Sequence, residues 1–380
     1  MEFIRREGEE DNDLIYRLYQ QKGTLTWREF TLLLNKNFGW DLSAECVRKR
    51  VRNYEADPKH KATDDLFREL EIKKQAFRDE RNAWNRQNRE QARIEENLSI
   101  LQEQIKEISS GIFEPVEPKQ QIQQKKSMLI LLTDWHIGLE FKNSFGTYSP
   151  EIARERAKQY ISHIQYIQEQ THCESACIVA LGDMINGNIR RTVQLQNRIN
   201  LIEQVKNASE LISNFIHTLL GYFPQIYYSG CSGNHSRIIE SKEDSLKDER
   251  LDNLIDWIVS KLLSEQKNFH YVKPFDNSMT ILDVLGHKVV GVHGDYDYFS
   301  KQGLNQIVSF LHDFPEIVCM GHMHTGAYLE DSNTVILRGG SLCGAGDDYT
   351  IQKRIRGRAS QVVAIIGEDG LESIHPVILK

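Results

Sequence analysis

The stretch from residue 127 to residue 136 reads Ser-Met-Leu-Ile-Leu-Leu-Thr-Asp-Trp-His. It is a short apolar run, typical of a buried strand, and a carboxylate and an imidazole follow it at once. The same combination recurs in order along the rest of the chain. The polar pieces are Asp134-Trp135-His136, Gly182-Asp183-Met184-Ile185-Asn186, Gly233-Asn234-His235, His293-Gly294-Asp295 and Gly321-His322-Met323-His324. Such groups at the ends of several strands can build a site for two metal ions.

The region around these pieces alternates between strand and helix patterns. Helices are expected at 150–170, 201–220, 246–263 and 301–312. Strands are expected at 127–132, 177–181, 225–229, 269–273, 278–283, 288–292, 316–320, 333–338, 361–366 and 373–379. Alternation first and mainly strands later predicts an α/β domain with two sheets covered by helices.

Length and composition limit the class of protein. A chain of 380 residues is long enough for two or three domains. Neither a membrane-length apolar run nor a signal peptide is evident, so we expect a cytoplasmic protein that does not enter a membrane. The six cysteines are scattered without a Cys-x-x-Cys pair and are expected to be reduced. The net charge of -7 means that any nucleic-acid binding must use local basic patches.

Residues 1–60 read as a compact group of helices. Thr26, with Glu29 three residues on, has the pattern of a capping box, and Gly39 has the pattern of a helix end. Ser43 then caps a third helix, whose outer side is basic: Arg48, Lys49, Arg50 and Arg52. This arrangement resembles the helix-turn-helix domains of small phage and bacterial DNA-binding proteins, which implies contact with DNA or RNA through those residues. The alternative is a packing or oligomerisation module with a solvated basic face.

Residues 61–110 fit a heptad frame and predict a coiled-coil helix. The apolar residues at its a and d positions are Leu66, Leu70, Phe77, Trp84, Ile94, Leu98, Leu101, Ile105 and Ile108. Such a helix favours a homodimer or a higher homo-oligomer, and the alternative is a helix docked on its own chain. Residues 111–127, which contain two prolines and a Gln/Lys-rich run, are expected to be a linker to a domain at 128–380.

The order of the polar pieces is also the order Asp-x-His, Gly-Asp-x-x-Asp/Asn, Gly-Asn-His-Glu/Asp, a lone His and Gly-His-x-His. On these motifs, residues 128 to about 345 resemble the calcineurin-like metallophosphoesterases, including the nuclease subgroup of the Mre11/SbcD type. The resemblance implies a four-layer α/β/β/α sandwich, here preceded by the small helical domain and the coiled-coil helix. It also implies two divalent metal ions at the loops that follow the strands.

The resemblance assigns the ligands as two overlapping sets. One ion would take Asp134, His136, Asp183 and His324, and the other would take Asp183, Asn234, His293 and His322. Two such ions clamp a phosphate and hold a hydroxide for attack. The mixture of oxygen and imidazole ligands suits Mn²⁺, with Fe or Zn²⁺ as alternatives. His235 is expected to act as general acid or to stabilise the transition state, and His136 is counted with it as catalytic.

Three departures from the family pattern bear on the substrate. Ser236 replaces the usual acidic residue after Gly-Asn-His, which generally supports that motif from behind. Asn186 replaces an aspartate, and the phosphate-binding arginine that follows that aspartate in protein phosphatases is absent. The chain ends at Lys380, which leaves no room for the capping domain of the double-strand-break nucleases. These departures argue against a protein phosphatase and against a capped nuclease.

Two arginine-bearing loops are expected near the metals, where their side chains could contact phosphodiesters. Arg190 and Arg191 lie in one, and Arg354 and Arg356 in the other, with solvated surface charge as the alternative for each. The resulting hypothesis is a metal-dependent phosphodiesterase, foremost a DNA or RNA nuclease of a bacterial or phage-infected cell. A phosphomonoesterase or small-nucleotide phosphodiesterase is one alternative. A dimeric DNA-binding protein with a vestigial or regulatory metal site is the other.

Overall fold

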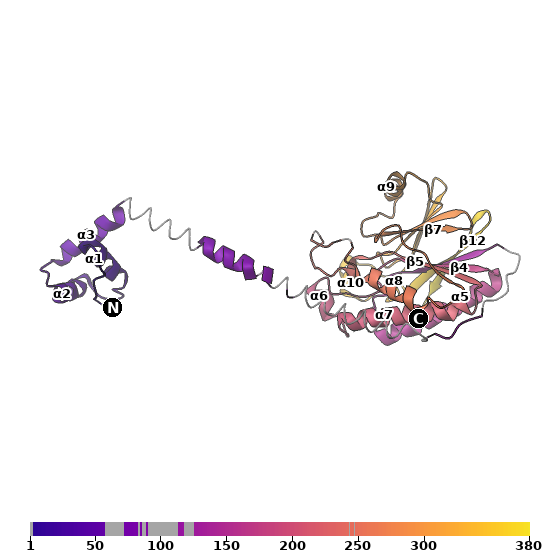
Figure 1. Cartoon of the computed structure of the whole chain (residues 1–380), viewed down its shortest axis with the longest axis horizontal. Coiled ribbons are helices and arrows are strands. Elements are labelled where there is room, and N and C mark those ends of the chain that lie inside the picture. The colour runs from indigo at the N-terminus through magenta and orange to yellow at the C-terminus, as the bar shows by residue number, and fades with distance from the viewer. Residues whose placement is uncertain are drawn as a thin grey trace. The chain divides into compact units, whose positions relative to one another are not determined.

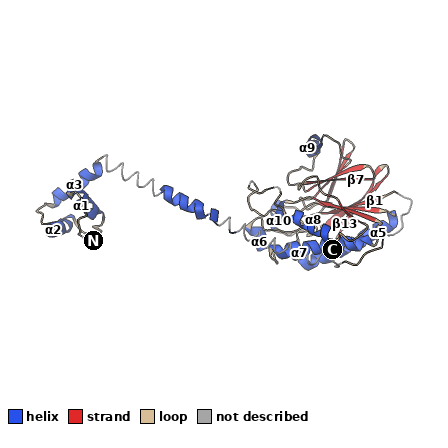
Figure 2. Ribbon diagram, in the orientation of Figure 1, coloured by secondary structure: helices blue, strands red, loops and turns tan. Residues whose placement is uncertain are grey.

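The computed structural model describes residues 3–57, 72–82, 84–85, 89, 113–117, 125–242, 244–246 and 248–380. The chain divides into two compact units, Met1–Leu98 and Ser99–Lys380, which Figures 1 and 2 show in colour by residue number and by secondary structure. We describe each unit by itself.

The N-terminal unit is built from α1 (Asp11–Gln20), α2 (Trp27–Phe38) and α3 (Ala44–Ala56). The capping box predicted at Thr26 and Glu29 is present, and Gly39 ends α2 in a left-handed conformation. Ser43 caps α3 by accepting a hydrogen bond from the Cys46 amide. The three helices share a small core: Leu14, Ile15, Leu18, Phe30, Leu34, Val47 and Val51. Each of its larger side chains stabilises the unit by about 1.5–3 kcal/mol through burial.

The predicted coiled-coil region is only partly described. Residues 72–82 and 84–85 are helical. Most of the predicted heptad positions, and residues 111–112 and 118–124 of the predicted linker, lie outside the described residues. Residues 113–117 lie against the larger unit, because Phe113 and Val116 contact its core and the Val116 amide donates to the Gln266 side chain.

The larger unit contains a six-stranded sheet in the order β13-β12-β1-β4-β5-β6 among its described residues. Strands β1, β4, β5 and β6 are parallel, and β12 and β13 extend the sheet antiparallel. The bounds are β1 Ser127–Leu132, β4 Ser175–Ala180, β5 Gln225–Gly230, β6 Phe269–Tyr271, β12 Ser360–Gly367 and β13 Gly370–Ile378. β1 is buried at every position, as expected for a strand covered on both faces.

A second sheet has the order β10-β11-β9-β8-β7. β8, β9 and β11 are parallel, and β7 and β10 are antiparallel edge strands. The bounds are β7 Met279–Val284, β8 His287–Val292, β9 Ile317–Met320, β10 Ala327–Asp331 and β11 Thr334–Arg338. A short hairpin of β2 (Phe141–Asn143) and β3 (Gly146–Tyr148) stands apart from both sheets.

Three apolar cores set the layers of this unit. One core lies between the two sheets and contains Leu129, Val179, Val289 and Cys319. A larger core covers the other face of the six-stranded sheet with α5 (Pro150–Thr171), α7 (Leu201–Leu220) and α8 (Leu251–Leu262). A third joins the five-stranded sheet to α9 (Lys301–Leu311). The predicted mixed α/β class with two helix-covered sheets is therefore confirmed.

Some elements differ from the prediction. The helix expected at 246–263 begins only at Leu251, because Arg237 and Arg250 form a β-bridge just before it. β2, β3, β10, α6 (Arg191–Leu195), α10 (Asp348–Lys353) and the 3₁₀ turn η1 (Asn234–Ser236) were not expected. All six are short, and a short element leaves little periodicity to detect. None of the helices in the described part of the chain has the length and apolarity needed to cross a membrane.

Candidate metal centre

Five loops bring the predicted ligands together, and each follows a strand. Three follow the neighbouring parallel strands β1, β4 and β5, and two follow the neighbouring parallel strands β8 and β9. The carboxyl ends of parallel neighbours meet at one edge of a sheet, where ligand sites in α/β proteins usually form. The common core between the sheets aligns these edges. Segments far apart in sequence thus converge, as with His136 and His324, which are 188 residues apart and in contact.

Many of the ligand-bearing residues have a left-handed backbone. The φ angles are 52° at Asp134, 45° at His136, 55° at Asp183, 68° at His322 and 55° at His324. Non-glycine residues rarely adopt this region, and it costs free energy that the surrounding structure must offset. Backbone strain of this kind is common at functional sites. In a regular strand successive side chains point to opposite faces, whereas a left-handed residue allows neighbouring side chains to point toward the same site.

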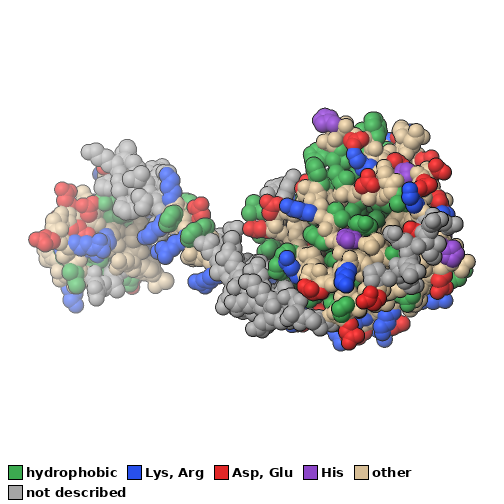
Figure 3. Space-filling model, turned by 45° about the vertical axis from the view of Figure 1, so that its right-hand side comes forward, with side chains coloured by type: hydrophobic (Ala, Val, Ile, Leu, Met, Phe, Trp, Pro, Cys, Tyr) green, Lys and Arg blue, Asp and Glu red, His purple; other side chains and the backbone are tan. Residues whose placement is uncertain are grey.

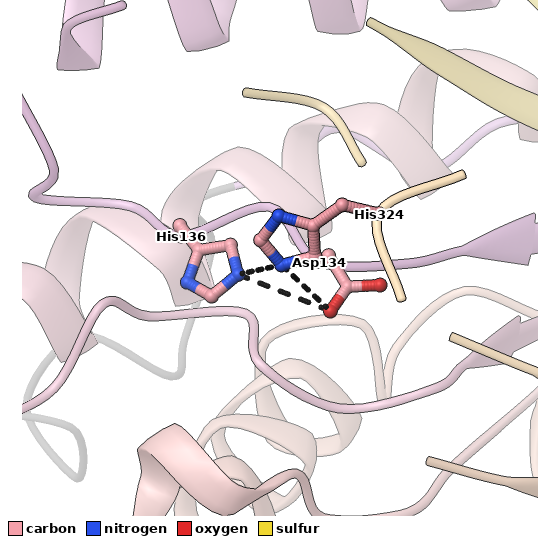
Figure 4. A group of neighbouring side chains, drawn as sticks. All are labelled: Asp134, His136 and His324. Atoms are coloured by element: carbon pink, nitrogen blue, oxygen red, sulfur yellow. Dashed lines mark hydrogen bonds and ion pairs between the residues drawn. The ribbon is translucent and has the colours of Figure 1, made fainter. Parts of the chain in front are cut away.

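Asp134, His136 and His324 form the first donor group, which Figure 4 shows with the side chains turned toward one another. The Nε2 atoms of the two histidines are 3.0 Å apart. Asp134 Oδ1 lies 3.9 Å from the first of them and 3.6 Å from the second. All three side chains are buried. The other oxygen of Asp134 accepts a hydrogen bond from the His322 amide, so this loop also fixes the next ligand.

Asp183, His293 and His322 form a second donor group, and Asn234 adjoins it. His293 Nε2 lies 3.2 Å from Asp183 Oδ2 and 3.1 Å from Asn234 Oδ1. The opposite nitrogen of the same ring, Nδ1, is 2.7 Å from the Leu181 carbonyl oxygen and donates to it. A hydrogen bond of this kind selects the tautomer that leaves Nε2 free to bind a metal.

Asp183 connects the two groups, because its carboxylate also lies within 4.8 Å of ring nitrogens of His136 and His235. The structure therefore brings together all seven residues to which we assigned a metal. A carboxylate with two oxygens is the ligand type that can bridge two cations.

The ionisable groups in this cluster are buried close together and shift one another's pKa values. Burial, aided by neighbouring histidines, lowers the pKa of His136 well below its usual value and that of His322 to about 4. Burial likewise lowers the pKa of His324 to about 4. These imidazoles are therefore neutral at pH 7, which is the form that binds metals. Burial also acts on His293, but Asp183 outweighs it and raises the pKa of that ring to about 10, so a cation bound at Nε2 would have to displace a proton from this nitrogen.

The residues fit divalent metal ions. Asp134 Oδ1, His136 Nδ1 and His324 Nδ1 are buried without a hydrogen-bond partner in the described structure, and the Nε2 atoms of the two rings face each other. Buried polar atoms in proteins nearly always have a hydrogen-bond partner, so several buried oxygen and nitrogen atoms without one indicate that a partner such as a metal ion normally binds there. Imidazole nitrogens with carboxylate and amide oxygens suit Mn²⁺, Fe or Zn²⁺.

His235 lies at the edge of the cluster. Its Nδ1 is 2.6 Å from the Asn186 carbonyl oxygen, and its amide donates to Asp183 Oδ1 over 2.7 Å. Its ring centre is 4.7 Å from that of His136, nearly perpendicular to it. The Asn186 side chain does not orient this ring and instead donates to Asn197. The backbone carbonyl of residue 186 therefore orients His235, which makes an aspartate side chain at that position unnecessary.

Asp252 is a buried carboxylate that sequence reasoning missed. Its Oδ2 accepts hydrogen bonds from the amides of Asp183 at 3.0 Å and Gly233 at 2.9 Å, and its Oδ1 accepts one from Met184 at 3.2 Å. It thus ties the loop after β4 to the loop after β5. Asp252 does not follow a strand and belongs to none of the sequence motifs, so the sequence carried no signal for its role.

Ser236 has a local role. Its hydroxyl donates to the Gly233 carbonyl oxygen over 2.7 Å and closes the turn that presents Asn234. The support that we expected from an acidic residue at this position comes instead from Asp252, on the amide side of the same turn.

Tyr349 is a second residue that we did not predict, and its ring centre lies 5.5 Å from that of His324.

The two basic loops are both close to the metal-binding loops. A side-chain carbon added at Gly357 would lie 2.5 Å from the His324 carbonyl oxygen, so the segment with Arg354 and Arg356 lies against that loop. Similarly, Gly187, three residues before Arg190, is in backbone contact with His235. The side chains of Arg190, Arg191, Arg354 and Arg356 are exposed. On the face that Figure 3 shows, basic and acidic side chains are interspersed.

In the N-terminal unit, Arg48, Lys49 and Arg52 are exposed on α3, and Arg50 is half-buried. The apolar residues Val47 and Val51 of the same helix face the core. The helix therefore presents a basic side to solvent, as its sequence pattern predicts.

No family model matches the chain. An uncharacterised SPbeta prophage-derived protein of Bacillus subtilis, YonJ, is 22% identical over 322 residues, which span 80% of this chain and 79% of that protein. The crystal structure of Vps29 of Entamoeba histolytica in complex with Zn²⁺ aligns with 66% of this chain. The alignment covers 96% of that structure, at 11% identity and a TM-score of 0.33. An archaeal phosphodiesterase covers 67% and 99% at 11% identity and a TM-score of 0.32. At such values, functional inference depends on the residues of the site.

Asp252→Asn is expected to weaken metal binding about 10–100-fold, because an amide cannot accept from all three backbone N–H groups and the two loops separate. Titration of the full chain with Mn²⁺ in a calorimeter measures this. Asp256→Asn is the matched control, since it changes a buried carboxyl group one turn further along α8 that accepts its hydrogen bond from the Tyr228 hydroxyl and not from a loop amide. Equal affinities for the two variants, with both folded by circular dichroism, would show that Asp252 does not position the ligands.

Proposed function

We propose that this chain is a dinuclear-metal-dependent phosphoesterase that hydrolyses phosphodiester bonds, with DNA or RNA as substrate. The observation that carries the proposal is the position of Asp183, which lies within 4.8 Å of donor atoms from both groups of histidines. The order of packed layers in the larger unit is compatible with the α/β/β/α sandwich of the metallophosphoesterases. We therefore assign Asp134, His136, Asp183 and His324 to one ion, and Asp183, Asn234, His293 and His322 to the other.

When bound, two such ions supply an activated hydroxide and neutralise charge on the phosphate. The residues of the chain do the rest. Asp252 and the hydrogen bond from His293 to Leu181 hold the ligands in place before substrate arrives. His235 donates from Nδ1 to the Asn186 carbonyl, which leaves Nε2 available to carry a proton. We propose that His235 gives this proton to the leaving oxygen as the phosphodiester bond breaks.

Two features favour nucleic acid over a protein or a small phosphomonoester. The loops with Arg190, Arg191, Arg354 and Arg356 border the metal-binding loops, and their exposed guanidinium groups can bind successive phosphates. The basic side of α3 offers a second contact, with Arg48, Lys49, Arg50 and Arg52, if the N-terminal unit acts as a helix-turn-helix domain.

We further propose that the coiled-coil region pairs with a second copy of the chain. The described part of it is helical, and Phe77 and Trp84, both predicted a positions, are 66% and 63% exposed. Burial of such aromatic side chains in a seam between two chains would stabilise a dimer.

Incubation of the pure protein with Mn²⁺ and labelled single- and double-stranded DNA and RNA tests the main proposal. We expect cleavage that is lost, by at least about 10³-fold, in Asp183→Ala, because neither ion is then held at its shared ligand. Asp369→Ala, which changes an exposed carboxylate in the turn after β12, should cleave normally. Hydrolysis of p-nitrophenyl phosphate without any cleavage of nucleic acid or of bis-p-nitrophenyl phosphate would instead establish a phosphomonoesterase.

The role of His235 is tested with leaving groups of different basicity. In His235→Gln, kcat for a dinucleotide should fall about 10²–10⁴-fold, since its alkoxide must be protonated as it leaves. The loss on bis-p-nitrophenyl phosphate should be much smaller, because p-nitrophenolate leaves without a proton. Metal content measured by mass spectrometry should be unchanged, and the exposed His163→Gln serves as control. A loss of the same size on both substrates would rule out proton donation.

The oligomeric state is measured by sedimentation velocity. Phe77→Glu combined with Trp84→Glu should dissociate the dimer, because charged side chains cannot be buried in the seam. Arg78→Glu changes an exposed residue at an outer position of the same helix and should leave it intact. A wild-type chain that sediments as a monomer at micromolar concentration would refute the pairing.

A further inference from the structure

Two buried arginines adjoin the metal centre. Arg237 directly follows η1, which carries Asn234 and His235, and Arg250 directly precedes α8, which carries Asp252. Their backbones pair in an antiparallel bridge. The two residues are only 6% and 9% exposed. Arginine is rarely buried to this extent unless it is paired with an anion.

The charges of these two arginines are only partly compensated within the described structure. Arg237 Nε and Arg250 Nη1 are buried and have no hydrogen-bond partner. Asp295 is the carboxylate whose field reaches both, but it forms its ion pair with Lys242, over 3.7 Å. Burial and the neighbouring Arg250 lower the pKa of Arg237. Two adjacent buried cations with unused donors indicate that an anion normally lies between or against them.

The position of Arg250 identifies where that anion would come from. Arg250 shares the wall of a cavity of about 480 Å³ with Gly233 and the ligand His293. A ligand in this cavity therefore touches the metal centre at one end. Tyr296 lines the same cavity, and its ring lies 3.8 Å from Lys242 Nζ. The cavity wall also contains four carboxylates, those of Asp248, Asp276, Asp295 and Asp297, so Arg250 is the position on this wall where an anion can be accepted.

We propose that Arg237 and Arg250 bind the phosphate next to the scissile one in a polynucleotide, while the metal ions hold the scissile phosphate. The inference deepens the proposed function and rests on it. Arg237 is separated from the ligand Asn234 by His235 and Ser236, and Arg250 lies within electrostatic reach of Asp295, which is two residues beyond the ligand His293. This offset is what a neighbouring phosphate requires. The pair would make the enzyme select substrates with at least two phosphates, which single phosphate esters lack.

Binding without catalysis tests this inference. In a calorimeter, the full chain with Mn²⁺ should bind thymidine 3′,5′-bisphosphate about 10–100-fold more tightly than thymidine 5′-monophosphate, the gain expected from charge-assisted hydrogen bonds. Arg237→Gln combined with Arg250→Gln should abolish this difference. Arg198→Gln should retain it, because that arginine is exposed and forms ion pairs with Glu140 and Glu151.

Equal affinity of the wild-type chain for the two nucleotides would overturn the inference, and so would a difference that persists in the glutamine double variant. If the glutamine variant does not fold, Arg237→Lys with Arg250→Lys keeps both charges but loses the fork geometry, and the difference should then shrink severalfold. Full retention in the lysine pair would also overturn the inference. The outcome is independent of the cleavage assay, so a chain that cleaves no nucleic acid but prefers the bisphosphate would contradict the proposed function alone.

Discussion

The candidate site depends on a close backbone contact between the loops after β4 and β5. A side-chain carbon at Gly182 would lie 2.3 Å from the Gly233 amide, and one at Gly233 would lie 2.1 Å from Asp183 Oδ1. Only glycine fits at these two positions, and the φ of 80° at Gly182 also favours it. Two amide groups that approach this closely need a common acceptor, and Asp252 provides it from α8. The position of Asp183 between the two histidine groups follows from this contact.

The same centre concentrates features that would destabilise a protein elsewhere. It has buried imidazoles facing one another, buried carboxylates whose negative charges repel, and non-glycine residues with a left-handed backbone. These costs can be met only because the two sheets and their helices form large cores around the site. Cations of charge two would remove most of the electrostatic part, which is why metal binding and the stability of such a centre are linked.

Substrate selection is organised outside the ligand set. The arginines that sequence patterns favoured lie in exposed loops, where a guanidinium group is readily solvated. Arg237 and Arg250 are buried instead and lack partners, so they have more to gain from a bound anion. Neither arginine belongs to a recognisable sequence motif: Arg237 directly follows η1, and Arg250 directly precedes α8. Arg250 lines a cavity together with His293, which makes the arginine pair relevant to phosphate chemistry.

The sequence by itself determined most strands of the two sheets and the loops that carry the candidate ligands. An apolar run that ends in Asp134, Asp183 or His293 is a local pattern, and so is the capping box at Thr26. Tertiary structure decided what local patterns cannot encode. The contacts of Asp252 span 69 residues, the start of α8 was shifted by a β-bridge, and Arg237 and Arg250 became a pair only when that bridge formed. The physical reason is that burial, hydrogen bonding and charge compensation depend on neighbours that the folded chain supplies from distant segments.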